Sequence, residues 1–161
     1  MDDPTSMSFF LECFSWNVNG LVQKFGDFLG ILRLYNFPKI VCLQEIHSSH
    51  DLALLWGSRL GSYFCYFSHG TTASCGTAIL VHRSLPFSIL QEICDTNGRF
   101  VILKGFLSGM QVTIGSIYAP SDTSRNREIF FDELIGLNLG NIHYLFGDYN
   151  SVCDNTLDRH N

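Results

Sequence analysis

Apolar residues are grouped along the chain in short runs and in longer stretches with helical spacing. Short apolar runs bounded by polar or glycine-containing breaks predict strands, and they occur at residues 9–18, 40–43, 63–67, 76–81, 84–90, 100–107, 111–118 and 142–146. Apolar residues spaced three or four apart predict helices, and they occur at residues 21–35, 51–60 and 125–137. The chain is therefore predicted to mix strands and helices.

Two pairs of turn-forming residues lie between consecutive predicted strands. Ser108–Gly109 predicts a two-residue hairpin, and Asn97–Gly98 predicts a turn of type I′. Hairpins in the middle of the chain, with helical stretches outside them, predict an α+β fold in which sheets are flanked by helices.

The composition predicts one folded domain. The chain has 161 residues, of which 46% are hydrophobic and only 16% are charged, so one substantial core is expected and disorder is not. We assign residues 1–8 to a flexible N-terminal segment and residues 9–161 to the domain. The net charge of −5 is unfavourable for contacts with DNA phosphates, so any DNA binding is expected to be weak.

The six cysteines are scattered and form no C-x-x-C pair, so neither a zinc cluster nor a compact disulfide framework is indicated. We interpret them as reduced core residues of an intracellular protein, nuclear or cytoplasmic. The acidic N-terminus, Met1–Asp2–Asp3–Pro4, is unlike a signal peptide, which predicts that the protein is not secreted. No apolar run reaches the ~20 residues of a membrane span, and no membrane association is expected.

Polar side chains follow the ends of four predicted strands, the position where open sheets place their functional sites. The Glu45 carboxylate is a suitable ligand for Mg²⁺, which prefers hard oxygen ligands. Asp148 and Asn150 lie two residues apart, so an extended backbone would point both side chains the same way. The Asp148 carboxylate could then take a proton from water while the Asn150 amide donates a hydrogen bond to a phosphate oxygen. The full set predicts a metal and phosphate site: Asn17, Glu45, Tyr118, Asp148 and Asn150.

Each of these residues also has a simpler interpretation when it is taken alone. Glu45 can be a solvated carboxylate, and Tyr118 can be an aromatic residue that ends a strand. Residues 147–150 can form an ordinary turn, and at least one of Asn17 and Asn19 can be a turn residue. The histidines show no metal-ligand spacing and are expected to be solvated or incidental: His47, His50, His69, His82, His143 and His160.

Several short motifs, taken together and in order, resemble those of the endonuclease/exonuclease/phosphatase superfamily. They are Asn17-Val-Asn19-Gly20-Leu21, Gln44-Glu45, Gly76-Thr-Ala-Ile-Leu-Val81, Asn97-Gly98-Arg99, Ile117-Tyr118-Ala-Pro120 and Gly147-Asp148-Tyr149-Asn150. The resemblance covers the chain from about residue 10 onward. It is strongest to the apurinic-type endonuclease domain of LINE-like (non-LTR) retrotransposons, in which the motif corresponding to residues 147–150 is followed by a segment similar to residues 154–159.

The resemblance implies a four-layered α/β sandwich of the DNase I-like type, acting as a DNA-nicking endonuclease that uses Mg²⁺, with Mn²⁺ as a substitute. It implies a reverse transcriptase domain downstream in the full-length relative, and we expect a monomer. A phosphoinositide or sphingomyelin phosphodiesterase is the alternative substrate class within the superfamily. The implied residue roles are metal binding by Glu45 and Asn19, catalysis by Asn17, Tyr118, Asp148 and Asn150, and nucleic-acid binding by Arg159.

Within those roles, Asn17 would orient the metal or the phosphate, Tyr118 would hold the phosphate, Asp148 would activate water and Asn150 would stabilise the developing charge. The chain departs from the family pattern in two respects. The smaller is that Tyr149 replaces the usual Phe. Relatives end in a Ser-Asp-His-type motif, and none occurs before Asn161. We therefore expect a C-terminally truncated domain that lacks the last strands of its second sheet. A catalytically inactive remnant is the alternative to an active nuclease.

Overall fold

The computed structural model describes residues 11–141 and 143–151. Their first sheet has the strand order β1-β2-β4-β3. Strand β1 (Cys13–Asn17) pairs in parallel with β2 (Ile40–Gln44), and β2 pairs antiparallel with β4 (Thr77–His82). Strand β3 (Tyr63–Ser68) completes the sheet by antiparallel pairing with β4. The parallel pair β1 and β2 is possible because a helix connects the two strands.

The second sheet has the strand order β5-β6-β7-β8. Strands β5 (Phe87–Cys94), β6 (Phe100–Leu107) and β7 (Met110–Tyr118) form an antiparallel meander. Strand β8 (His143–Asp148) then pairs in parallel with β7. The C-terminal ends of β7 and β8 therefore lie side by side, as do those of β1 and β2.

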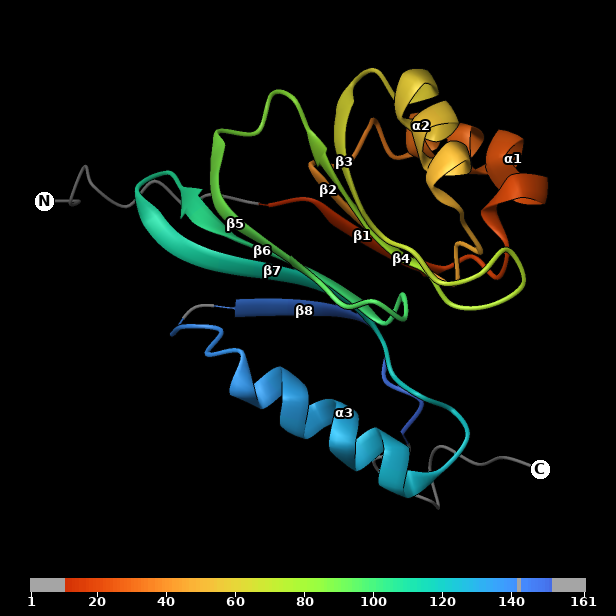
Figure 1. Ribbon diagram of the computed structural model, residues 1–161. Helices are drawn as coiled ribbons and strands as arrows, with labels where there is room; N and C mark the ends of the chain where they lie inside the picture. The colour runs from red at the N-terminus through yellow and green to blue at the C-terminus, as the bar shows by residue number, and fades with distance from the viewer. Residues whose placement is uncertain (1–10, 142, 152–161) are drawn as a thin grey trace, which may run out of the picture.

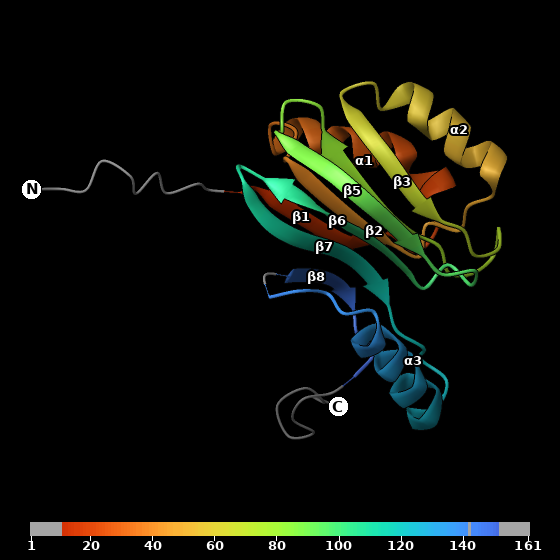
Figure 2. The same cartoon turned by 60° about the vertical axis from the view of Figure 1, so that its left-hand side comes forward.

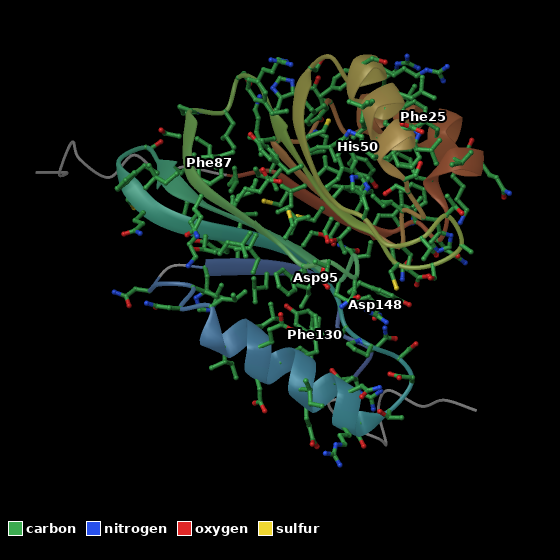
Figure 3. All side chains as sticks on the ribbon, viewed as in Figure 1. Phe25, His50, Phe87, Asp95, Phe130 and Asp148 are labelled. Atoms are coloured by element: carbon green, nitrogen blue, oxygen red, sulfur yellow. The ribbon has the colours of Figure 1, made fainter. Side chains whose placement is uncertain are left out.

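Helices cover the outer face of each sheet, and both views show them on opposite sides of the molecule (Figure 1, Figure 2). Helices α1 (Leu21–Leu34) and α2 (His50–Arg59) pack on the first sheet through a cluster that includes Phe28 and Trp56. Helix α3 (Ser124–Gly136) packs on the second sheet through Phe130, which Figure 3 shows between the helix and the strands. This arrangement confirms the predicted four-layered sandwich.

The space between the sheets is filled by alternate residues of the strands, as the two-residue period of a strand requires. Representative side chains in this central core are Ile40 and Ile79 from the first sheet and Leu103 and Ile114 from the second. All four are at most 1% exposed. Inward-facing residues alternate with outward-facing residues along the whole of each strand. The same alternation decides which side chains at the strand ends face the candidate site.

Two local predictions differ from the structure. The strand predicted at residues 84–90 is instead β5, because Leu85 donates to His82 O in a turn and Pro86 has no backbone donor. The Asn97–Gly98 turn is not of type I′, since only Gly98 has a positive φ, at 74°. The hairpin turn at Ser108–Gly109 is confirmed, with φ values of 49° and 83°.

Five cysteines lie in the described part of the chain, and all are free: Cys13, Cys42, Cys65, Cys75 and Cys94. Cys153 and the predicted flexible segment at residues 1–8 lie outside the described residues. In residues 11–141 and 143–151, no helix has the length and apolar character needed to cross a membrane.

Candidate active site

The C-terminal ends of β1, β2, β7 and β8 meet at one edge of the sandwich. Parallel pairing sets Asn17 opposite Gln44 in the first sheet, so Glu45 follows at the strand end. In the second sheet it sets Tyr118 opposite Asp148. Strand β8 contacts both β1 and β2 across the sandwich, and Figure 3 shows Asp148 at this junction. The fold therefore brings together side chains from four strand ends.

Backbone hydrogen bonds extend the strand pairing past the strand ends. Gly20 N donates to Glu45 O at 2.7 Å, which holds the loop after β1 against the loop after β2. Ala119 N donates to Asp148 O at 2.8 Å, which does the same for β7 and β8. The site residues are thus placed by main-chain geometry as well as by their own side-chain contacts.

The Asn17 amide links two carboxylates. Its Nδ2 donates to Glu45 Oε1 at 2.7 Å and to Asp148 Oδ2 at 3.1 Å. Its Oδ1 accepts from the backbone N of Asn19 at 3.2 Å, which fixes the orientation of the amide. Because Glu45 belongs to the first sheet and Asp148 to the second, one side chain joins the acidic groups of both sheets.

Tyr118 completes the cluster from β7. Burial raises the pKa of its hydroxyl, and the negative charge of Glu45 raises the pKa further. The Arg99 guanidinium lies 5.2 Å from the centre of the Tyr118 ring and lowers this pKa in part. A phenol is protonated at neutral pH, and the raised pKa is in keeping with Tyr118 acting as a hydrogen-bond donor. The sequence pattern assigned Arg99 no role, although Arg99 stands in one of the quoted motifs.

His47 differs from the expectation that the histidines are solvated. Its side chain is 17% exposed, and its Nε2 lies 3.5 Å from Glu45 Oε2. That nitrogen is buried and has no hydrogen-bond partner among the described residues. His47 is therefore a close neighbour of the Glu45 carboxylate. Its position in the sequence matches no metal-ligand spacing, so the sequence alone did not identify it as a residue of the site.

Asn150 lies beside the cluster but points elsewhere. Its φ of 44° shows that the expected extended backbone after Asp148 is wrong. Its backbone N donates to Asp148 Oδ1 at 2.9 Å, and its Nδ2 donates to Ala119 O at 2.7 Å. The side chain of Asn19 is exposed, and only its backbone N reaches Asn17. Arg159 lies outside the described residues.

Left-handed backbone conformations are concentrated around the site. Such conformations cost non-glycine residues of order 1–3 kcal/mol each and often mark functional sites. They occur in the loops that follow β1, β2 and β8 and in the loop that precedes β4: Asn19 (44°), Glu45 (52°), His47 (51°), Cys75 (60°) and Asn150 (44°). Asparagine tolerates this conformation, but Glu45, His47 and Cys75 are held in a backbone conformation that such residues rarely adopt.

The donor set fits a divalent cation of the Mg²⁺ type. Glu45 and Asp148 lie within hydrogen-bond distance of a single amide, and the Glu45 side chain is 22% exposed and so can be reached by a ligand. Mg²⁺ is typically held by one or two carboxylates and keeps several waters. No cluster of three or more His, Cys, Asp or Glu side chains forms a closed metal cage in the part of the chain that the structure describes. A hollow of about 620 Å³ opens beside Asn17 and Asp148.

Comparison with known proteins gives a consistent result. Residues 14–160 match the endonuclease/exonuclease/phosphatase family. Humanized D. rerio TDP2 with 14 mutations is similar to this chain, with a TM-score of 0.67, 23% sequence identity, and coverage of 88% of this chain and 63% of that chain. The 3′ phosphatase NExo from Neisseria, bound to a product DNA hairpin, is also similar, with a TM-score of 0.65 and 20% sequence identity. The match covers 91% of this chain and 60% of that chain.

An AP endonuclease from Archaeoglobus fulgidus gives a TM-score of 0.63 and 19% sequence identity, with coverage of 91% of this chain and 60% of that chain. These likenesses establish the DNase I-like fold. This chain spans less than two thirds of the length of each of these three proteins.

Proposed function

Because the chain belongs to the endonuclease/exonuclease/phosphatase family, we propose that it is a phosphodiester hydrolase that nicks DNA with the help of a divalent cation. The observation that carries the proposal is the convergence of Glu45 and Asp148 on the amide of Asn17. Two carboxylates and an adjacent protonated phenol are the groups needed to hold a cation, accept a proton from water and bind a phosphate oxygen.

Each side chain has a distinct proposed task. Glu45 would hold the cation, and Asn19 stays a proposed member of the metal site. Asp148 would orient and deprotonate the attacking water, while Asn17 keeps its carboxylate aligned. The Tyr118 hydroxyl would donate to the phosphate. Asn150 would stabilise charge if its amide left Ala119 O, and in the observed geometry it steadies the residue next to Tyr118.

Members of the family generally use divalent metal ions, and we propose Mg²⁺, with Mn²⁺ as a substitute. The bound cation would act as a Lewis acid on the phosphate. DNA as the substrate is supported by the similarity to NExo, which was solved with a product DNA hairpin. The net charge of −5 predicts that binding to DNA is weak and sensitive to salt.

The proposal extends to context that rests on the resemblance in the sequence motifs. We propose a retrotransposon origin, a reverse transcriptase domain in the full-length protein, a DNA-contacting role for Arg159, a monomeric state and an intracellular location, nuclear or cytoplasmic. The free thiols of the described residues are compatible with a reducing compartment.

The test is nicking of supercoiled plasmid with Mg²⁺ or Mn²⁺. Wild-type protein should nick, whereas Glu45→Gln and Asp148→Asn should each lower the rate by at least about 10²-fold, the scale of one acid–base group. Tyr118→Phe should lower the rate while leaving Arg99 its aromatic neighbour. Glu128→Gln, a matched change of an exposed carboxylate on α3, should nick at the wild-type rate.

Two other outcomes would change the assignment. Mn²⁺ binding that Glu45→Gln weakens, without any nicking, would favour an inactive remnant that retains the metal site. Hydrolysis of a phosphoinositide or sphingomyelin in place of DNA would favour the alternative substrate class. Nicking at equal rates by wild-type protein and Glu45→Gln would show that the activity does not arise from this site.

A further inference from the structure

A layer of polar side chains, two of them buried and one exposed, lies directly beneath the candidate site. Side chains alternate along a strand, so residues two positions apart face the same space. Ser15 therefore lies below Asn17 on β1, and Ser116 lies below Tyr118 on β7. Gln44 ends β2 immediately before Glu45. Gln44 is 1% exposed and Ser116 is completely buried.

Hydrogen bonds join these three residues into one unit, which we call the polar bridge (Ser15, Gln44 and Ser116). Gln44 Nε2 donates to Ser116 Oγ at 3.0 Å and to Ser15 Oγ at 3.3 Å. Ser116 Oγ in turn donates to the backbone carbonyl of Leu43 at 3.0 Å. Strands β1 and β2 belong to the first sheet and β7 belongs to the second. Two of the three hydrogen bonds therefore cross between the sheets.

Much of the remaining space between the sheets is packed with apolar side chains, including Cys42, Ile114 and Phe146. Apolar contacts carry no directional preference, so on their own they permit small shifts of one sheet over the other. Hydrogen bonds require defined distances and angles. The polar bridge is therefore one of the features that fix the relative placement of the two sheets, together with the hydrogen bonds from Asn17 to Asp148 and from Ser68 to Asp95.

The bridge is poorly explained as a source of stability. Burying an amide and a hydroxyl has a desolvation cost that their mutual hydrogen bonds largely cancel, and apolar replacement of such groups is often nearly neutral. Its position one layer below the site suggests a different role. Glu45 stands on the same sheet as Gln44, while Tyr118 and Asp148 stand on the same sheet as Ser116.

We propose that Gln44 is a positioning residue that sets the separation of Glu45 from Tyr118 and Asp148. Its amide holds the two sheets at the distance at which Asn17 can reach both carboxylates. The inference rests on the proposed metal-binding function, since this separation determines how the carboxylates receive a cation. Groups that orient metal ligands in this way typically contribute 10- to 100-fold to metal affinity or activity.

Three variants separate positioning from packing. Gln44→Met keeps the length and volume of the side chain but removes the amide. Ser116→Ala removes both hydrogen bonds that cross between the sheets. Ser15→Ala removes only the hydrogen bond within the first sheet and is the matched control. Each variant is compared with wild type by its Mn²⁺ dissociation constant, its thermal unfolding, and the side-chain amide resonances of Asn17 in metal-free protein.

Gln44→Met and Ser116→Ala should weaken Mn²⁺ binding about 10- to 100-fold and shift the Asn17 resonances toward those of a free amide. Ser15→Ala should change both much less. If Gln44→Met does not fold, Ser116→Ala and its control decide the question. Wild-type affinity and unshifted Asn17 resonances in the folded variants would overturn the proposal, even if thermal stability fell. Absence of Mn²⁺ binding by wild type would count against the proposed function, and the Asn17 resonances would still decide the placement of the sheets.

Discussion

Asn17 Nδ2 donates a hydrogen bond to Asp148 Oδ2 at 3.1 Å, although the two residues are 131 positions apart in the chain. The same nitrogen donates to Glu45 Oε1 at 2.7 Å. Two carboxylates that share a small site repel each other. The Asn17 amide donates to both of them and so offsets this repulsion.

Asn17→Ala should therefore destabilise the metal-free protein. The two carboxylates would lose their shared donor, at a cost of about 1–3 kcal/mol in the free energy of unfolding. Saturating Mn²⁺ should restore part of this loss, because a cation would neutralise the same carboxylates. Urea unfolding with and without Mn²⁺ measures both effects, and Asn141→Ala, at an exposed position, is the control. An equal loss under both conditions would contradict a shared role in holding the carboxylates.

Gly147→Ala should destabilise the protein and displace Asp148. A Cβ at Gly147 would collide with the backbone carbonyl of Ile117, its partner on β7. The two strands would have to separate, which typically costs about 1–3 kcal/mol. Gly30→Ala is a matched control, because a Cβ there meets no atom within 4 Å, and it should stabilise α1 by about 0.4–1 kcal/mol. Equal stabilities of the two variants in urea unfolding would refute this account.

Asp95→Ala should open the turn between β5 and β6 and so release the backbone of Arg99. The Asp95 carboxylate is surrounded by donors, and Figure 3 shows it toward the same end of the sheets as Asp148. Its loss leaves several polar groups without a partner and should lower the free energy of unfolding by about 1–3 kcal/mol. The donors are Arg99 N at 2.6 Å, Ser68 Oγ at 2.9 Å, Asn97 N at 3.0 Å and Phe100 N at 3.1 Å.

Two comparisons complete that experiment. Asp132→Ala removes an exposed carboxylate from α3 and should change the stability by less than about 0.5 kcal/mol. Amide hydrogen exchange should become faster in residues 95–100 of Asp95→Ala and stay unchanged in α1. Unchanged protection of the turn would show that the carboxylate does not hold it.

Alkaline pH should destabilise the protein through three thiols whose pKa values are raised in the folded state. Burial raises the pKa of Cys13 and Cys65 from 9.0 to about 11, and burial together with the charge of Glu92 raises that of Cys94 to about 12. The folded state binds these protons more tightly than the unfolded state does. Their stabilising contribution is therefore complete below pH 9 and is lost as the pH rises through 11.

Urea unfolding at intervals from pH 7 to about 10.5 measures this decline. Cys65→Ala should show a shallower decline than wild type, because it removes one of the titrating groups. A free energy of unfolding that stays constant above pH 9 would contradict the prediction.

Local patterns in the sequence were sufficient for much of the fold. The spacing of apolar residues located α1, and the Ser108–Gly109 pair identified its hairpin, because both depend on interactions between near neighbours. Strand β5 was misplaced because a turn at Leu85 and Pro86 delays its start, and a bulge near Ile89 alters its register. Such irregularities depend on the partner strand rather than on the local pattern.

The residue types at the ends of the strands can be read from the sequence, and they were enough to select Asn17, Glu45, Tyr118 and Asp148. How these side chains meet follows from the three-dimensional packing. The shared amide of Asn17, the approach of His47 to Glu45 and the turned-away side chain of Asn150 all depend on contacts between distant segments or on left-handed backbone. A sequence pattern records the two-residue period of each strand, but the distance between two sheets is set by packing and by buried hydrogen bonds such as that from Gln44 to Ser116.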